Sequence, residues 1–217
     1  MPTGGTETPT KKQIEFKRRE EEILKAALSL FQGPCWEQIT VEQISKKAEI
    51  GKGTVYKHFT CKEEIYANIT IAFTQRLFEA FYEAAKNREV LDILKQIIRL
   101  GFQYFLNHPA EARVSFYCKR EDFRDRLHPE LGARFDALDN EFEAFISPIL
   151  QRGIEEGLFP NVPVEHLMMG LAATFDGAIA MIWNGDTSYR QAENQEAYVD
   201  IISTYMLAGL VGLKKGT

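Results

Sequence analysis

The sequence predicts an all-α protein in which a small N-terminal helical domain precedes a larger C-terminal helical bundle. Apolar residues recur at the 3.6-residue spacing of helices along most of the 217 residues, and no alternating run with hairpin turns indicates strands. Hydrophobic residues make up 45% and charged residues 26%, as in ordinary globular proteins. Residues 1–60 carry 10 Lys/Arg against 8 Asp/Glu, whereas residues 61–217 carry 16 against 23, which favours two domains with different partners.

The first predicted helix follows a segment without periodicity. Residues 1–10 are rich in Thr, Gly and Pro, so we expect a disordered arm there. An amphipathic helix is predicted over 13–31 and should end before the pair Gly33-Pro34. A charged run over 17–22 precedes the apolar residues of this helix, and a basic cluster spans 11–19.

Two short helices are predicted next. Thr40 should cap a helix over 41–48, because Gln43 follows at the third position of a capping box. Gly51 is expected to turn the chain in a left-handed conformation before a second helix over 52–59. Two helices of this length joined by a short turn with glycine are typical of the helix-turn-helix motif that binds DNA.

The second short helix offers an outward face suited to DNA. If Val55 and Phe59 pack inward, small and polar residues remain outside. Lys, Thr, Tyr and His donate to phosphates, Lys and Thr also read base edges, and Gly allows close approach of the backbone. The candidate contacts are Lys52, Gly53, Thr54, Tyr56, Lys57 and His58.

The remainder of the chain is predicted to be helical as well. Thr60 is a second candidate cap, with Glu63 at the third position, and it should open a long helix over 61–85. Glycine and proline residues separate the helices that follow. Their predicted ranges are 90–107, 110–120, 129–156, 164–184 and 194–213.

Three segments resemble the DNA-binding domain of the TetR family of transcriptional regulators. They read ITVEQIS (39–45), AEIGKGTVYKHF (48–59) and KEEIY (62–66). The resemblance implies a three-helix DNA-binding domain and a larger helical domain that dimerises and binds a small ligand. We therefore expect the disordered arm over 1–10, the DNA-binding domain over 11–60, and the ligand-binding and dimerisation domain over 61–217.

The same resemblance assigns roles to individual residues. It implies that the outward residues over 52–58 are the contacts of the recognition helix, with Tyr56 and His58 at positions that grip phosphates. Thr40 would donate to a phosphate from the start of the preceding helix, and Lys62 would hold another. The basic cluster over 11–19 is a weaker candidate for the DNA backbone or minor groove.

Aromatic residues concentrate in the C-terminal part, where a helical bundle can enclose an apolar cavity for a hydrophobic effector. Asp176 interrupts an apolar run, so it should pair with a helix terminus, contact a partner subunit or face the ligand. Similarity to acyl-responsive members of the family suggests a fatty acyl compound, with a multidrug-type effector as the alternative. The candidate ligand-binding residues are Phe102, Phe105, Phe116, Tyr117, Phe142, Phe175, Asp176, Ile179 and Trp183.

The last two predicted helices are apolar over more than one face, and small residues would allow another helix to approach closely. Two such helices from each subunit would form a four-helix interface of a homodimer, as the family resemblance also implies. Two-fold symmetry then predicts a palindromic operator in double-stranded DNA. The candidate interface residues are Leu167, Leu171, Tyr198, Ile202, Tyr205 and Met206.

Other classes of protein find little support. Cys35, Cys61 and Cys118 form no CxxC pair, which favours a reducing cytoplasm, and no run of 18 apolar residues predicts a transmembrane helix or a membrane partner. The motifs HExxH, GxSxG and GxGxxG are absent, so we expect no catalytic residue, metal or cofactor. The alternative to a regulator is a helical small-molecule binding protein without specific DNA binding.

Overall fold

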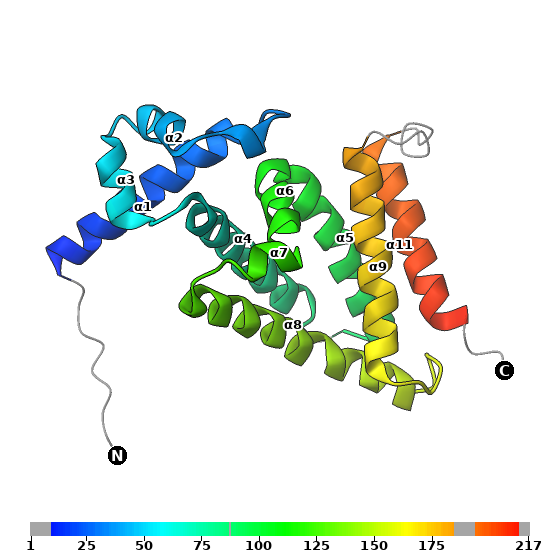
Figure 1. The fold of residues 1–217 in the computed structure, drawn as a ribbon. Coiled ribbons are helices and arrows are strands. Elements are labelled where there is room, and N and C mark those ends of the chain that lie inside the picture. The colour runs from blue at the N-terminus through cyan, green and yellow to red at the C-terminus, as the bar shows by residue number, and fades with distance from the viewer. Residues whose placement is uncertain (1–9, 87, 185–193, 213–217) are drawn as a thin grey trace, which may run out of the picture. The chain divides into compact units, whose positions relative to one another are not determined.

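The computed structural model describes residues 10–86, 88–184 and 194–212, and every regular element within these ranges is a helix (Figure 1). The prediction of an all-α protein is confirmed. Residues 1–9 of the expected arm and the expected break at Gly185-Asp186 lie outside the described residues. The elements are α1 (Lys11–Leu30), the 3-10 helix η1 (Trp36–Gln38), α2 (Val41–Lys47), α3 (Lys52–His58), α4 (Lys62–Ala84), α5 (Val90–Asn107), α6 (Pro109–Cys118), α7 (Glu121–Arg124), α8 (Pro129–Glu155), α9 (Val164–Trp183) and α11 (Gln195–Gly212).

The helices form two compact units that do not follow the order of the chain. The first unit comprises Met1–Thr70 and Arg113–Leu131, and the second comprises Ile71–Ala112 and Gly132–Thr217. Helices α4 and α6 therefore contribute residues to both units. The expected domain boundary after residue 60 lies between α3 and α4, whereas the division between the units falls inside α4.

Helix α1 begins two residues earlier than its apolar pattern predicts. Thr10 caps it through a capping box, in which the backbone N–H of Gln13 donates to the Thr10 hydroxyl at 3.3 Å. In return the backbone N–H of Thr10 donates to the Gln13 side chain at 2.8 Å. The box places Lys11 and Lys12 in the first helical turn.

An aromatic cluster forms the centre of the first unit. Trp36, on the short helix η1, is buried and lies edge-to-face against Phe31, Tyr66 and Tyr117, with ring centroids 5.9, 5.5 and 5.7 Å away. Such edge-to-face pairs add to the stabilisation from burial. Burial also raises the pKa of the Tyr66 hydroxyl, because the enclosed ring disfavours the charged phenolate.

The end of α1 is held by a residue that lies far along the chain. The guanidinium of Arg113, on α6, donates to the carbonyl oxygens of Phe31 and Gln32, both at 3.1 Å. The last carbonyls of a helix have no partner within that helix, so these bonds satisfy groups that would otherwise need water. This contact, like those of Tyr117 with Trp36 and Tyr66, joins residues after 112 to the first unit.

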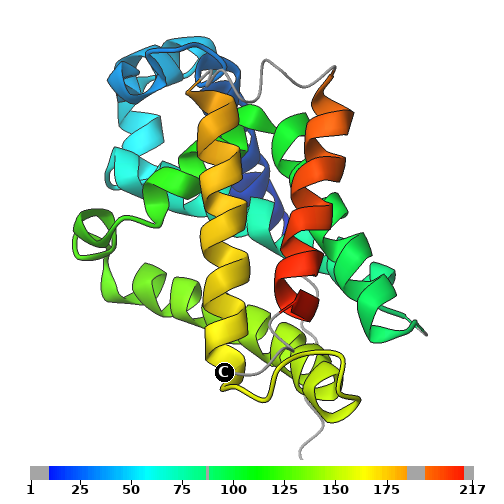
Figure 2. The same ribbon diagram turned by 90° about the vertical axis from the view of Figure 1, so that its right-hand side faces the viewer.

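Helix α5 is the central element of the second unit. Its buried face packs against α9 and α11, which lie side by side in both views (Figures 1 and 2). Arg99 on α5 forms ion pairs with Asp200 and, at 4.0 Å, with Glu196 on α11. Leu91 is exposed, and the buried residues of α5 are Val90, Ile93, Leu94, Ile97, Ile98, Gly101, Phe102 and Phe105.

Helix α9 is long and apolar enough, by length and composition alone, to cross a membrane. No unbroken apolar run marks this property in the sequence, because Glu165 and Asp176 interrupt the segment. Only 17% of the residues in its most apolar window are buried in the single chain. An apolar helix with so much exposed surface fits packing against another chain as well as it fits lipid.

Two local predictions about turns and caps are wrong. The left-handed residue between α2 and α3 is Glu49, with φ of 56°, whereas Gly51 has φ of −69° and is the N-cap of α3. Helix α2 ends in a Schellman motif, in which the N–H of Ile50 donates to the Ser45 carbonyl at 3.0 Å, and this motif requires the left-handed residue at position 49. Thr60 bonds Glu64 rather than Glu63, and α4 begins only at Lys62.

Two glycines of α8 should respond in opposite ways to the same added methyl group. A Cβ at buried Gly153 would overlap the buried ring of Phe159, whereas a Cβ at Gly132 would meet no atom within 4 Å. We expect Gly153→Ala to lower the free energy of unfolding by about 1–3 kcal/mol through overpacking. Gly132→Ala should raise it by up to about 1 kcal/mol, because alanine favours helix. Denaturant unfolding of both variants measures the difference, and equal effects would contradict the packing described for Gly153.

Candidate nucleic-acid interface

The helix-turn-helix predicted from the sequence is present. Thr40 caps α2 through the predicted capping box, with the N–H of Gln43 donating to the Thr40 hydroxyl at 3.2 Å. Helix α3 is fixed against α2 by the side chain of Val55, which is fully buried, and by Phe59 directly after the helix. These two contacts hold one face of α3 inside the first unit, so its opposite face is available to a partner.

The outward face of α3 carries the residue types expected for a DNA groove. Lys52, Gly53, Tyr56 and Lys57 are exposed, and Tyr56 keeps 45% of its surface. Thr54 is half-buried. A methyl group at Gly53 would meet no protein atom within 4 Å, so nothing in the described chain requires glycine there. Four of the six predicted recognition residues therefore form one accessible surface.

His58 differs from the other predicted recognition residues. Its side chain is only 7% exposed, and its ring lies 4.1 Å from the ring of Phe16 on α1. Its Nδ1 lies 3.9 Å from a carboxylate oxygen of Glu20, also on α1. The structure thus gives His58 a contact that orients α3 against α1, and its predicted phosphate contact would need the side chain to turn outward.

Thr40 and Lys62 also have partners within the protein. The Thr40 hydroxyl donates to the Gln43 side chain at 3.2 Å. The Lys62 ammonium donates to the carbonyl oxygens of Glu37 at 2.7 Å and Ile39 at 3.2 Å. An ammonium has three donors, so two bonds leave Lys62 one donor for a phosphate. Lys62 also fixes the backbone directly before Thr40, and this positioning role was not predicted from the sequence.

The predicted ligand-binding residues do not form a single cluster. Phe175 on α9 meets Phe102 and Phe105 of α5, with ring centroids 4.6 and 5.1 Å away, and Ile179 is buried one turn further. Phe142 stacks on Phe78 of α4 in the same unit, and Asp176 and Trp183 are half-buried on α9. Phe116 and Tyr117 belong to the first unit instead, where Tyr117 packs in the aromatic cluster and Phe116 lies beneath the Lys119 ammonium.

Several predicted interface residues are buried within the single chain. Leu167, Tyr198 and Met206 are buried, and the Tyr198 hydroxyl donates to the Ala178 carbonyl at 3.3 Å, which ties α11 to α9. Leu171 and Ile202 are half-buried, whereas Tyr205 is 68% exposed. Periodicity located the two helices, but it did not distinguish the face used inside the chain from the face left outside.

Of the predicted interface residues, only Tyr205 lies on the exposed face of α9 and α11, and the other residues of this face are small or apolar. Met169 is 68% exposed and Ile201 is 61% exposed. The members on α9 follow one another at four residues, and on α11 both Ala208 and Gly209 lie three or four residues after Tyr205, so the members on each helix share one side of it. This exposed face comprises Met169, Ala173, Gly177 and Met181 on α9, and Ile201, Tyr205, Ala208 and Gly209 on α11.

The described residues offer little for covalent or metal chemistry. Within 10–86, 88–184 and 194–212, no group of three His, Cys, Asp or Glu side chains could hold a metal ion. Cys118 is buried, and burial raises its thiol pKa to about 12, which disfavours the reactive thiolate. Cys35 is exposed and Cys61 is partly buried.

The capped helix α2 and the exposed polar face of α3 define a DNA-binding protein of the helix-turn-helix class.

Comparisons with known proteins agree with this class. Residues 23–69 match the family model described as bacterial regulatory proteins, tetR family. The chain is 26% identical over 164 residues to the transcriptional repressor NicS of Pseudomonas putida, covering 72% of this chain and 73% of NicS. It is 27% identical over 155 residues to the repressor KstR2 of Mycobacterium tuberculosis, covering 70% of this chain and 74% of KstR2.

A solved structure shares the fold over most of the chain. It is the transcriptional regulator FadR from Bacillus subtilis in complex with stearoyl-CoA, with a TM-score of 0.68 and 19% identity. The match covers 87% of this chain and 98% of FadR. These matches support a TetR-family regulator, with the family match itself lying in the DNA-binding region over residues 23–69.

Sequence reasoning missed two residues of α1 that support the recognition helix. Phe16 and Glu20, four residues apart, lie on one face of α1 and together cover His58. A usable signal was present, because Phe16 is the aromatic residue of a mostly charged segment over 11–22. Their contacts place the first turns of α1 beside the end of α3.

Proposed function

We propose that this chain is a homodimeric repressor that binds a palindromic DNA operator and leaves it when a hydrophobic small molecule binds. The observation that supports it most strongly is the α3 surface of Lys52, Gly53, Tyr56 and Lys57, which is polar, accessible and backed by a buried Val55. A regulator of this kind acts where the chromosome is, so we propose a cytoplasmic location.

The second copy would pack on the exposed face of α9 and α11. Large apolar side chains beside small ones, such as Tyr205 beside Gly209 one turn away, allow helices of another subunit to approach closely. Exposed apolar side chains along two neighbouring helices of a DNA-binding regulator favour association with an identical subunit over lipid. Two-fold symmetry would place two copies of α3 in successive major grooves of a palindrome.

The effector would be an elongated or aromatic hydrophobic compound. Phe102, Phe105 and Phe175 bring three rings together between α5 and α9. Because FadR is seen with stearoyl-CoA, a long-chain fatty acyl compound is the first effector to test. A multidrug-type compound is the alternative that the same aromatic surface would accept.

Release from DNA requires that the effector and the operator prefer different conformers of the dimer. An effector with equal affinity for both conformers would not shift the equilibrium between them, however tightly it bound. Helices α4 and α6 contribute residues to both units, so a displacement of either helix would affect both. The reciprocal expectation is that operator DNA weakens effector binding by the same factor.

Two lysine substitutions test the assignment of the recognition helix. Lys57→Ala should change the preferred base at one operator position, because an exposed lysine on α3 can read a base edge. Lys62→Ala should weaken binding to all sequences alike, because Lys62 supports the backbone before Thr40. Each change removes one positive charge, so net charge cannot explain a difference between them. Unaltered operator binding by both variants would show that α3 is not the recognition helix.

The effector class is tested on the protein–operator complex. We expect stearoyl-CoA to release the operator at concentrations at which free coenzyme A does not. A multidrug-type cationic dye that releases it, while stearoyl-CoA does not, would support the alternative. Release by neither compound would reject both effector classes.

A further inference from the structure

We propose that the first two turns of α1 form a second DNA contact, in which Lys11, Lys12 and Lys17 bind operator phosphates beside the groove occupied by α3. We call the surface formed by these three lysines the α1 basic face. The proposal rests on the proposed function, because it extends the operator contact beyond the helix-turn-helix. Nothing in the family match covers these residues, since that match begins at residue 23.

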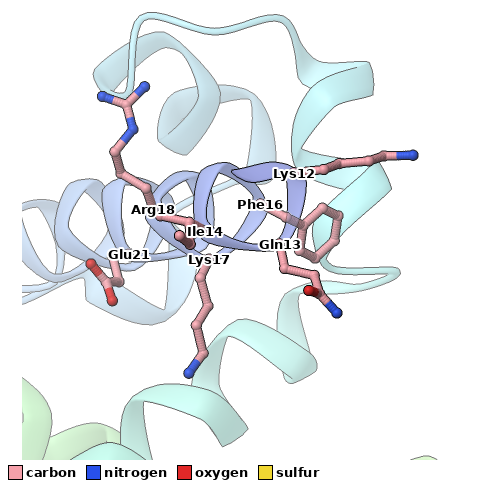
Figure 3. A pocket seen from close by; sticks show the side chains of 7 residues that line it. All are labelled: Lys12, Gln13, Ile14, Phe16, Lys17, Arg18 and Glu21. Carbon is pink, nitrogen blue, oxygen red and sulfur yellow. The ribbon is translucent and has the colours of Figure 1, made fainter. Parts of the chain in front are cut away.

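The α1 basic face is ordered and accessible. The capping box of Thr10 and Gln13 fixes the start of the helix, and residues 11–18 are exposed. Figure 3 shows a pocket along this part of α1, lined by residues that include Lys12, Ile14, Phe16 and Lys17. Because α1 already begins at Lys11, these lysines project from a helical backbone rather than from a flexible tail.

The three lysines of the α1 basic face carry positive charges that no acidic side chain of the described residues pairs with. Arg18 and Arg19 are already engaged, with Arg18 2.6 Å from Glu15 and Arg19 2.7 Å from Glu22. The hydrogen bond from Arg18 lowers the pKa of Glu15, so this carboxylate stays charged and paired. Among the described residues, no ion pair is formed by Lys11, Lys12 or Lys17.

The contact with His58 places the α1 basic face next to the recognition helix. Lys12, Phe16 and Glu20 are spaced four residues apart and therefore share one side of α1. Phe16 and Glu20 contact His58, the last residue of α3. Lys12 lies one turn before Phe16 on the same side of α1, next to the end of α3 that Phe16 contacts. Figure 3 shows the side chains of Lys12 and Phe16 projecting in the same direction.

DNA fits this surface better than an anionic membrane does. A helix that lies on a membrane needs a broad apolar side, with aromatic residues free to insert among the lipids. Here Ile14 and Phe16 are the exposed large apolar side chains of the first two turns, and the ring of Phe16 is engaged with His58. DNA phosphates continue on either side of the major groove, so a helix beside α3 meets them without a further rearrangement.

The salt dependence of operator binding tests the proposal. The variant Lys11→Ala/Lys12→Ala/Lys17→Ala is compared with Lys25→Ala/Lys86→Ala/Lys95→Ala, which removes three exposed lysines and the same charge elsewhere. Both triple variants should remain folded by circular dichroism. In the first variant, the slope of log K against log salt should become shallower by about 0.9 for each phosphate that a protomer no longer neutralises. The operator sequence preferred by the first variant should not change.

The outcomes separate this inference from the proposed function. A wild-type protein that selects no operator would contradict the proposed function itself. A wild-type protein with a specific operator, whose slope is unchanged in the first variant or equally reduced in both, would overturn the inference alone. So would a first variant that loses binding to vesicles of anionic lipid while its operator binding stays unchanged.

Discussion

Trp36→Ala should lower the free energy of unfolding of the first unit by about 3–5 kcal/mol, the usual cost of removing a large buried aromatic side chain. Trp36 packs against three aromatic rings, those of Phe31, Tyr66 and Tyr117, so its removal leaves a cavity with several walls. A loss of this size is a large part of the roughly 5–15 kcal/mol that holds a typical domain folded. Operator binding should therefore fail at temperatures that the wild type tolerates.

Hydrogen exchange shows where the stability is lost. In Trp36→Ala, amides of α2 and α3 should exchange faster, while amides of α5 and α11 in the second unit should keep most of their protection. Trp36→Phe is the matched control, because it retains an aromatic ring and should lose clearly less stability. A uniform loss of protection along the chain, or a loss below about 1 kcal/mol, would show that Trp36 does not anchor the first unit.

Gly53→Ala should separate folding from DNA binding. The added methyl group meets no protein atom within 4 Å and lies inside helix α3, so the variant should be as stable as the wild type or up to about 1 kcal/mol more stable. Operator affinity should fall by about tenfold to a hundredfold, comparable to the cost of one mismatched base pair. The physical reason is that glycine permits an approach of the backbone to DNA that a methyl group blocks.

Thermal unfolding and operator titration of the same preparation measure both effects. The matched control is Gly132→Ala on α8, which also adds a methyl group into open space but lies in the second unit. This control should keep the operator affinity of the wild type. Unchanged affinity in Gly53→Ala would place Gly53 outside the close contact with DNA.

The helix-turn-helix could be predicted from the sequence because short-range signals specify it. The capping box of Thr40 and Gln43 and the inward pair Val55 and Phe59 act within one or two turns, and the structure confirms both. The short elements η1 and α7 were not predicted. Each contains one buried aromatic residue, Trp36 or Phe123, and a segment of three or four residues has no periodicity of its own.

The candidate sites of the C-terminal part could be predicted only in outline. Periodicity marks α9 and α11 as apolar, but the side chain that packs inside, such as Tyr198, looks in sequence like the exposed Tyr205. Similarly, Tyr117 reads as one aromatic residue among many, whereas its contacts with Trp36 and Tyr66 assign it to the first unit. Partners that lie many residues apart decide these cases, and local spacing carries no information about them.

The most direct measurement is selection of bound sequences from a randomised DNA duplex pool, at roughly physiological salt where non-specific binding is weak. The purified protein should be refolded without ligand first, so that a bound effector cannot keep it off DNA. We predict enrichment of a palindrome, with half-sites about one helical turn apart, as two copies of α3 related by a two-fold axis require. No enrichment by a folded dimer would contradict the account and favour a helical small-molecule binding protein.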